Sequence, residues 1–412
     1  MFEAVTFENA SRLPLRALLL ASVALAGCHG KRAAPTPSEP SSASAQASHA
    51  VVPAAKFDRV SRGDFNRLAS ELNLPLFWSE DKNRNGALEP EELAVYWGLA
   101  PGARLTDYVV AERNAFTARM TNAYDAIVRR QAGIVVNPGD PKEAARRAAV
   151  VKELAQGRPT LVATDFSKAS EEERAFVALV MKSAELVEQI YAKQLGTAAL
   201  KLKVPADDTA SQTLFFRSQG PRCQAPLTQD DPLCSAIPDF TEKKLSGLYP
   251  HDLLNQPNFC EALAKRDKAL MDPFVAVAGD VNAPRALPYN QAYAPEMGQI
   301  AEQLRAAARA IGDKEPALQN YLTAAAQSFV KNAWWPADEA WAKMDAKNSK
   351  FYLRIGPDET YEEPCNSKAL FHVSFGLINQ GSLAWQQKLE PFRSDMESAL
   401  AELAGPPYKA RK

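Results

Sequence analysis

The sequence predicts a mainly helical α+β fold with a small β-sheet near the C-terminus. Apolar residues recur at helical spacing over most of the chain, and two short segments near residues 351 and 371 alternate apolar and polar residues. At 412 residues the chain is long enough for two domains or one large domain with a sizeable core. A composition of 46% hydrophobic and 24% charged residues excludes global disorder.

Positive and negative charges are almost balanced. Lys and Arg together number 48 and Asp and Glu 49, which gives a net charge of −1. Because no field of one sign exists, we expect no attraction to nucleic acid or to an anionic membrane surface. The sequence contains no G-x-x-x-x-G-K-[ST], G-x-G-x-x-G or G-x-S-x-G motif. It therefore predicts no nucleic-acid or nucleotide partner and no hydrolase of the nucleophile-elbow type.

Residues 1–27 have the pattern of a signal peptide. Arg12 and Arg16 form a positive region, residues 17–26 are apolar, and Leu25-Ala26-Gly27-Cys28 resembles the lipobox of bacterial lipoproteins. The resemblance implies that Cys28 becomes the lipidated first residue. The protein is then held in the bacterial cell envelope, on the periplasmic or outer face of a membrane. The alternative is an ordinary secretory signal followed by a structural cysteine.

Residues 28–56 are rich in Pro, Ser and Ala and contain almost no bulky apolar side chain. Such a composition cannot bury a core, so we expect a disordered tether between the membrane and the folded body. No apolar run in the body approaches the roughly 18 residues that a membrane-spanning helix needs. We divide the body into a calcium-binding module over 57–100 and a helical, α+β region over 101–412.

Start and stop signals indicate several helices. Asp140 as N-cap, Pro141 and Gly157 delimit one helix, and Ser170 with Glu173 opens a second that runs towards Gly196. Similar patterns predict helices over 106–132, 295–311, 316–332 and 383–404. The segment 204–294 is rich in Pro, Asp, Gly and Cys, and we expect it to be ordered but irregular.

Two segments predict β-strands because apolar residues occupy alternate positions. In the first segment Phe351, Leu353 and Ile355 alternate with polar residues, and in the second Phe371, Val373, Phe375 and Leu377 do so. The link between the two segments is too long for a tight hairpin turn.

Once Cys28 is set aside, the remaining cysteines are Cys223, Cys234, Cys260 and Cys365. An even number in an exported protein suggests disulfides. Four cysteines permit three connectivities and the sequence selects none of them, although the short spacing favours pairing Cys223 with Cys234. Zinc is the competing use, but no C-x-x-C pair is present.

The segment 81–92, DKNRNGALEPEE, matches D-x-[DN]-x-[DN]-G-x5-E at every required position and resembles an EF-hand loop. A hard cation such as Ca²⁺ takes six to eight oxygen ligands, and this spacing supplies them from one short segment. Gly86 permits the sharp turn. The predicted oxygen donors are Asp81, Asn83, Asn85, the backbone carbonyl of Ala87, Glu89 and the bidentate Glu92. A calcium-free turn that keeps the pattern is the alternative.

An EF-hand loop is normally flanked by helices. We expect one helical turn over 75–80 before the loop and an exit helix over 91–97. Because the loop has few charged ligands and the sequence shows no second loop, we expect weak binding, with a dissociation constant of about 10⁻⁴ to 10⁻³ M. The ion would then be structural.

The segment 350–379, KFYLRIGPDETYEEPCNSKALFHVSFGLIN, is similar to dipeptidyl peptidase III and its bacterial relatives. The similarity extends through FFRSQGPRC at 215–223, towards residue 60. It implies a two-lobed peptidase fold of which only the N-terminal part is present. It also implies that Glu359 and Tyr361 hold the free amino terminus of a bound peptide, since a carboxylate and a phenol accept hydrogen bonds from an ammonium group. Without the resemblance, residues 358–363 would be a solvated acidic loop.

The resemblance implies zinc chemistry as well, but the family's zinc motif, H-E-x-x-G-H, is absent. The histidines are His29, His49, His251 and His372, and no two lie four residues apart. We expect His251 in a loop and His372 on the polar side of its strand. Two interpretations remain: a non-catalytic, lipid-anchored calcium-binding protein with a peptide-cradling lobe, or the N-terminal portion of a zinc dipeptidyl peptidase whose catalytic lobe lies beyond Lys412.

Overall fold

The computed structural model describes residues 56–96, 99–100, 102–134, 139–166, 168–242, 244–360 and 363–411. The predicted signal peptide, the lipidation site Cys28 and all of the tether except its last residue lie outside these ranges. Within the described part, no helix combines the length and the apolar character needed to cross a membrane.

Helices and short antiparallel strand pairs follow one another along the chain, and the predicted α+β class is confirmed. The α-helices are α1 (Arg62–Glu71), α2 (Ala118–Gln131), α3 (Pro141–Ala155), α4 (Glu171–Gln194), α5 (Thr209–Ser218), α6 (His251–Leu254), α7 (Phe259–Arg266), α8 (Tyr289–Ala292), α9 (Ala294–Ile311), α10 (Pro316–Lys331), α11 (Trp335–Ala342), α12 (Gln380–Leu389) and α13 (Arg393–Ala404). The strands are β1 (Leu76–Trp78), β2 (Leu93–Val95), β3 (Val109–Val110), β4 (Ala115–Phe116), β5 (Val275–Ala278), β6 (Arg285–Pro288), β7 (Phe351–Glu359) and β8 (Leu370–Leu377). In the described residues they pair as β1–β2, β3–β4, β5–β6 and β7–β8.

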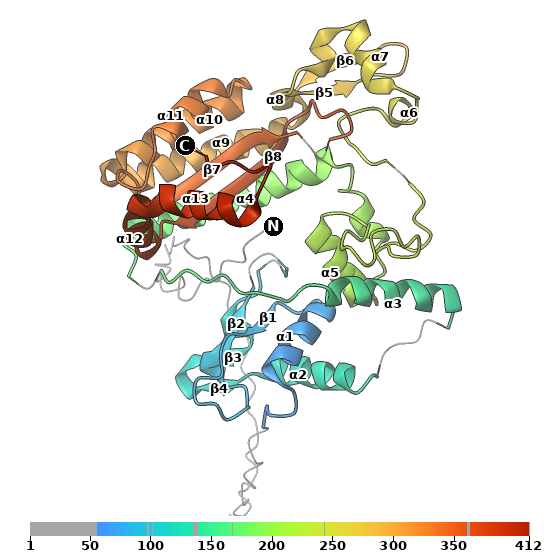
Figure 1. Ribbon diagram of the computed structural model, residues 1–412. Coiled ribbons are helices and arrows are strands. Elements are labelled where there is room, and N and C mark those ends of the chain that lie inside the picture. The colour runs from blue at the N-terminus through green and yellow to red at the C-terminus, as the bar shows by residue number, and fades with distance from the viewer. Residues whose placement is uncertain are drawn as a thin grey trace, which may run out of the picture.

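The largest core surrounds α4. Helix α4 packs against α9 and β8, α9 packs against α10, and α10 packs against β7, so that three helices bury one face of the β7–β8 sheet (Figure 1). Helix α4 begins as predicted: the Ser170 hydroxyl accepts a hydrogen bond from Glu173 N, and the Glu173 carboxylate accepts one from Ser170 N. This reciprocal capping satisfies backbone donors that the first helical turn leaves open.

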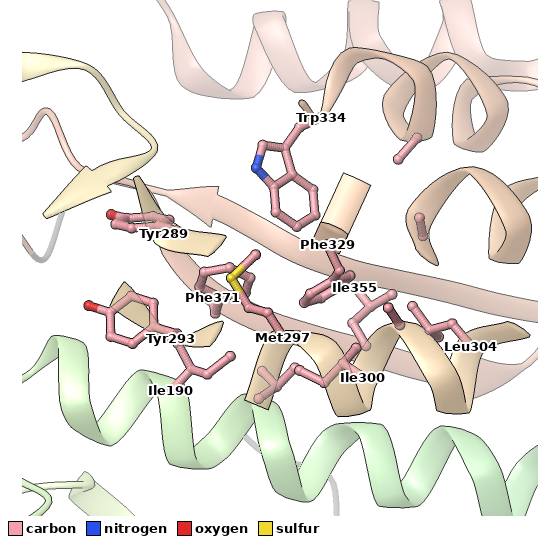
Figure 2. Close-up of a cluster of buried hydrophobic side chains, with 14 of the residues drawn as sticks. Ile190, Tyr289, Tyr293, Met297, Ile300, Leu304, Phe329, Trp334, Ile355 and Phe371 are labelled. Atoms are coloured by element: carbon pink, nitrogen blue, oxygen red, sulfur yellow. The ribbon is translucent and has the colours of Figure 1, made fainter. Parts of the chain in front are cut away.

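Phe371, near the start of β8, lies at the centre of an aromatic cluster in this core (Figure 2). Its ring centroid is 5.6 Å from that of Tyr289, 5.7 Å from that of Phe329 and 5.7 Å from that of Trp334. Offset and edge-on ring pairs at such distances add to the free energy of apolar burial. The cluster therefore fixes where β8 begins relative to the helices.

The N-terminal elements form a second core, which lies at the bottom of Figure 1. Helix α1 packs against β1 and α2, with Phe65, Trp78 and Tyr124 fully buried. The buried Asn66 side chain accepts a hydrogen bond from Trp78 N at 2.7 Å and donates one to Trp78 O at 3.1 Å, which attaches β1 to α1.

A third core lies between α3 and α5. Asp140 caps α3 as predicted, since its carboxylate accepts a hydrogen bond from Lys142 N. The buried Arg146 guanidinium donates to Asp208, Ser211 and the Ser235 carbonyl. A buried charge with these partners is compensated, and it joins α3, α5 and the loop after α5.

Several predicted segments differ in the structure. The helix predicted over 106–132 begins only at Ala118, because Asn114 adopts a left-handed conformation (φ 44°) that reverses the chain between β3 and β4. The segment 204–294, expected to be irregular, contains α5, α6, α7, α8 and the β5–β6 pair. Its prolines often precede elements instead of breaking them: Pro250 and Pro288 are the N-cap residues of α6 and α8. His251, expected in a loop, is the first residue of α6.

The helix predicted over 383–404 is interrupted. It divides into α12 and α13, joined by a 3₁₀ turn over Glu390–Phe392 that contains Pro391. Proline lacks a backbone N–H and clashes with the preceding turn, which accounts for the break. Neither helix buries a residue, and the large apolar side chains exposed there are Trp385, Leu389, Phe392, Met396, Leu400 and Leu403.

The neighbouring residues Trp334 and Trp335 provide a test of the main core. Trp334 is 5% exposed and contacts Phe329 and Phe371, whereas Trp335 is 77% exposed. We expect Trp334→Ala to lower the free energy of unfolding by about 3–5 kcal/mol, because it leaves a cavity. Trp335→Ala should change it by no more than about 0.5 kcal/mol. Urea denaturation of both variants measures the difference, and equal effects would contradict this account of the core.

Candidate functional site

Strands β7 and β8 carry the segment that the sequence analysis selected. The ladder pairs Ile355 with Val373 and Pro357 with Phe371, but Glu359 pairs with Leu370, so that Asp358 is an extra residue in β7. A β-bulge of this kind twists the strand locally and redirects side chains, and bulges are common beside functional sites. The bulge lies at the end of β7, next to the loop that leads to β8.

The bulge residue Asp358 belongs to an ion-pair network on the outer face of the sheet. Arg354 Nη2 lies 3.1 Å from one Asp358 oxygen, and Arg354 Nη1 lies 2.6 Å from Asp338 of α11. His372 Nε2 lies 3.7 Å from the other Asp358 oxygen. The Arg354 guanidinium also stacks over the Trp341 ring, 5.0 Å from its centroid.

Two opposing effects act on the pKa of Asp358. Partial burial raises it, but the hydrogen bond and the positive charge of Arg354 outweigh burial and leave the pKa below its ordinary value. Asp358 is therefore ionised at neutral pH and already paired with a cation. The network orients the bulge. Because Arg354 already occupies the Asp358 carboxylate, Asp358 is poorly suited to bind the ammonium group of a ligand.

The two residues predicted to bind a peptide terminus follow the bulge directly. Glu359 is the last residue of β7, and its backbone pairs with Leu370. Tyr361 lies outside the described residues. The structure thus places the backbone of one predicted residue at the mouth of the β7–β8 loop, and the roles of both residues remain predictions.

One edge of the sheet is covered by a helix side chain. Ile355 N donates to the Tyr321 hydroxyl at 2.8 Å, so the N–H and C=O groups of Ile355 point away from β8. In an antiparallel ladder, the residue opposite such a position also directs its N–H and C=O groups to the outside of the pair. That residue is Val373. By the same alternation, the backbone N–H and C=O groups of Phe371, Phe375 and Leu377 also point outward from β8.

Hydrogen bonds with the Gln194 side chain satisfy the outer edge of β8 at its start. Phe371 N donates to Gln194 Oε1 at 2.8 Å, and Gln194 Nε2 donates to Ala369 O at 3.2 Å. Gln194, at the end of α4, is buried. Beyond it, no hydrogen bond within the described part of the chain reaches the outward backbone groups of Val373 and Phe375. An unpaired edge of this kind is a template for another extended segment.

Gln194 and Tyr321 carry no sequence signal for these roles. Both lie on helices distant in sequence from the strands, 177 residues before Phe371 and 34 before Ile355. No local pattern marks a helical glutamine or tyrosine as a partner of a strand edge. Arg354, in contrast, occupies a polar position of the alternating pattern.

The predicted calcium loop lies between two strands, and the helices predicted on either side of it are wrong. Residues 76–78 form β1, residues 93–95 form β2, and a 3₁₀ turn, Pro90–Glu92, precedes β2. The strands pair directly, with Phe77 opposite Ala94. Pairing to a neighbouring strand and burial of Trp78 and Leu93 override the local helical preference of the exit segment.

Inside the loop, several of the predicted donors contact one another. The Asp81 carboxylate accepts hydrogen bonds from Asn85 N and Gly86 N, which closes the turn at Gly86, where φ is 73°. The Glu89 carboxylate accepts hydrogen bonds from the side-chain amides of Asn83 and Asn85 at 2.6–3.1 Å. Four predicted donor side chains therefore lie within one compact, solvent-exposed turn.

Glu92 differs from the other donors because it is buried, with 1% of its surface exposed. Its carboxylate accepts hydrogen bonds from Lys82 N at 2.7 Å and from the Trp78 indole at 3.0 Å. The all-oxygen donor set fits Ca²⁺ chemically. The Asp81, Glu89 and Glu92 carboxylates do not all lie within 4.8 Å of one another, so a bound ion would have to draw them together.

Among the residues that the structure describes, one group of metal-binding types gathers within 4.8 Å: Glu153, Cys223 and Cys234. The two cysteines are joined in a disulfide, and the Glu153 carboxylate accepts hydrogen bonds from Arg217 and from Ala225 N. This group therefore consists of satisfied structural residues.

The four body cysteines form two disulfides, Cys223–Cys234 and Cys260–Cys365, with Cα–Cα distances of 5.6 and 5.5 Å. The pairing that the spacing favoured is present.

The clearest cavity, about 420 Å³, lies away from β7 and β8, at the start of α3. Its charged lining is already paired: Lys142 contacts Asp239 at 2.5 Å, and Arg146 contacts Glu143 and Asp208. Asp140 in turn caps α3, so each charged side chain of the lining already has a partner within the protein.

Comparisons with known proteins found one similar protein sequence and similar solved structures. No family model matches the chain. "Nudix hydrolase 3" of Arabidopsis thaliana is 23% identical over 297 residues, which are 58% of this chain and 38% of that protein. The dipeptidyl peptidase III structure from Caldithrix abyssi matches with a TM-score of 0.51 and 22% identity, over 60% of this chain and 47% of that one. The structure from Corallococcus sp. strain EGB matches with a TM-score of 0.48 and 22% identity, over 61% of this chain and 47% of that one.

The chain thus spans less than half the length of each of these three proteins. At this level of identity the likeness shows the fold and not the activity. The chain contains a lobe with a dipeptidyl peptidase III-like fold, as the resemblance of residues 350–379 implied.

Proposed function

We propose that this lobe binds extended peptides along the outer edge of β8 and holds their free amino terminus at Glu359 and Tyr361. The observation that carries the proposal is that no hydrogen bond among the described residues reaches the outward backbone groups of Val373 and Phe375, on the strand that follows Glu359 and the β7–β8 loop. Main-chain hydrogen bonds to a strand edge give affinity for any extended peptide, and a terminal site adds selectivity. The dipeptidyl peptidase III-like fold supports the same class of ligand.

The covered start of β8 restricts how such a peptide lies. Because Gln194 occupies Ala369 O and Phe371 N, pairing can begin only beyond Phe371. The β7–β8 loop is at the end where β8 begins, so a peptide with its ammonium group at this loop runs parallel to β8. We assign the ammonium group to Glu359 instead of Asp358, because Asp358 is paired with Arg354.

Terminal selectivity can be measured directly. A peptide with a free amino terminus should bind at least about tenfold more tightly than its N-acetylated form, since a hydrogen bond to a charged group contributes about 1.5–3 kcal/mol net. Glu359→Gln should remove this difference. Glu362→Gln, a matched change in the same acidic loop, should keep it. Isothermal titration calorimetry provides the dissociation constants, and equal affinity of the wild type for both peptides would refute the terminal site.

A second candidate function is that the lobe cradles the substrate of a dipeptidyl peptidase whose zinc ligands lie outside this sequence. The fraction of the Caldithrix abyssi chain that is matched, 47%, favours it. His251 and His372 form a poor zinc site within the described part of the chain, because they lie on different elements and His372 adjoins Asp358.

Residues 29–412 should then neither bind stoichiometric zinc nor release dipeptides. One zinc per chain, with turnover lost in His372→Ala, would show that the lobe is itself the enzyme.

We propose in addition that the loop over 81–92 binds a structural Ca²⁺. Its support is the match to the calcium-loop pattern and the grouping of Asp81, Asn83, Asn85 and Glu89 in one turn. Glu92 would supply the sixth position after exchanging its present hydrogen bonds for the ion.

Calcium should raise the melting temperature of the wild type, because only the folded loop presents the donor set. Glu92→Gln should abolish the increase, whereas Glu91→Gln, one residue away and outside the donor set, should preserve it. Differential scanning calorimetry in millimolar Ca²⁺ and in excess chelator measures both. An unchanged melting temperature of the wild type would exclude the site.

The lipobox supports a proposed lipid anchor at Cys28 in the bacterial cell envelope. Membrane fractionation of Cys28→Ala tests the anchor, and retention of the variant in the membrane fraction would rule it out.

A further inference from the structure

Helices α12 and α13, together residues 380–404, form an arm whose helices bury none of their residues in the described part of the chain. Among the described elements each helix packs closely only against the 3₁₀ turn that joins them, and both are red in Figure 1. Helices of 10 and 12 residues are marginal in water on their own and gain most of their stability by packing an apolar face. The stability of the arm therefore depends on a surface that covers it.

One face of the arm carries an apolar stripe. Its members follow one another at intervals of three or four residues, the spacing of a single helix face, and the intervals continue through the turn that contains Pro391. The stripe consists of Trp385, Leu389, Phe392, Met396, Leu400 and Leu403, all of them exposed. The segment after α13 lies elsewhere, since the Tyr408 hydroxyl and Arg411 N both donate hydrogen bonds to Glu397, outside the stripe.

The exposed area of the stripe approaches that of a specific protein interface. The exposed fraction of its members runs from 47% for Leu389 to 87% for Leu403. Since a large apolar side chain presents about 150–250 Å² when fully exposed, the six members offer about 700 Å². The largest apolar patch of a typical monomer covers about 300–600 Å². A specific interface buries about 800 Å² per partner, so the stripe is large enough for a stable complex with one partner.

The order of residues along the stripe makes it complementary to itself. An antiparallel alignment of two arms, with a two-fold axis near Ser394, pairs Trp385, Leu389 and Phe392 with Leu403, Leu400 and Met396 of the partner subunit. Every member of the stripe then meets an apolar side chain, and none is left over. Self-complementarity of this kind is what an interface between two identical chains requires.

We infer that a second copy of this chain covers the apolar stripe, with the two arms antiparallel around a two-fold axis. The dimer removes from water six large side chains of each copy, and their burial stabilises the two short helices. Only Ile378 and Asn379 lie between β8 and α12, so the interface adjoins the end of the strand that carries the proposed peptide-binding edge. The inference does not depend on that function, since it rests on the arm alone.

A lipid surface fits the arm less well than a second copy does. Amphipathic helices that bind anionic membranes carry mainly Lys and Arg on their polar face. The charged residues over 380–404 are Lys388, Arg393, Glu390, Asp395, Glu397 and Glu402. Acidic residues thus outnumber basic ones, and anionic headgroups would repel the arm.

Sedimentation equilibrium of the full chain tests the dimer, with Cys28→Ala introduced throughout so that the proposed lipid cannot itself associate. The chain should dimerise with a micromolar or tighter dissociation constant, as interfaces of this size do. Leu400→Glu should raise this constant at least about hundredfold, because the dimer would bury unpaired carboxylates. Ser398→Glu, the same change at an exposed position on the opposite face of α13, should raise it less than about threefold.

Two results of this comparison overturn the inference. The first is a chain with the unaltered stripe that stays monomeric throughout the micromolar range. The second is a Leu400→Glu variant that dimerises as tightly as the chain with the unaltered stripe, which would place the interface on another surface.

Cross-linking covers the case in which Leu400→Glu unfolds, and it also tests the antiparallel order. The four body cysteines are paired in disulfides, so a cysteine placed on the stripe is the free thiol of the Cys28→Ala chain. A short bis-maleimide should couple Leu389→Cys chains to Leu400→Cys chains in a mixture, and should couple neither variant to itself. Coupling of each variant to itself, or no coupling in the mixture, overturns the inference.

Sedimentation with vesicles of phosphatidylethanolamine and phosphatidylglycerol distinguishes the two occupants of the stripe. The chain with the unaltered stripe and its Leu400→Glu variant should bind these vesicles equally. A monomeric chain whose vesicle binding is lost in Leu400→Glu and kept in Ser398→Glu would make the stripe a membrane-binding surface and overturn the inference.

Discussion

The β7–β8 sheet depends on helices covering its inner face, because an isolated two-stranded sheet is at best marginally stable in water. Phe351, Leu353 and Ile355 of β7 and Phe371 of β8 bury their side chains against α4, α9 and α10. The same helices supply the groups that satisfy the sheet's edges, since α10 contributes Tyr321 and α4 contributes Gln194. The part of β8 that these groups leave unpaired is the surface on which the proposed function depends.

The polar outer face of the sheet is organised by charge. Arg354 holds Asp338 of α11 and Asp358 of the bulge, and its stacking on Trp341 keeps the guanidinium in place. Arg354 pairs with Asp358 and keeps it ionised, so the acidic residues of the segment 358–363 do not all have the same role. Asp358 orients the bulge, the buried Glu363 closes the following turn, and Glu359 lies at the strand end between them.

Particular elements show how far the sequence could predict this structure. The N-caps Asp140 and Ser170 were predictable because capping involves only residues within one helical turn. The β7 and β8 segments were predictable because alternation records which face of a strand is buried. The flanks of the calcium loop were not, since β1 and β2 become strands by pairing with each other across the loop. Likewise, no local signal identifies Gln194 as a partner of β8.

The sequence by itself determined the α+β class, the extent of α3, α4, α9 and α10, the calcium-loop pattern and the segment that resembles dipeptidyl peptidase III. Each of these depends on neighbouring residues, whose spacing dictates hydrogen bonding and amphipathicity directly. Only the tertiary structure decided that Cys260 pairs with Cys365, that Glu92 is buried beneath its loop and that, within the described residues, the outer edge of β8 beyond Phe371 has no hydrogen-bond partner. These features join residues far apart in the chain, and they arise from which surfaces the helices can bury together.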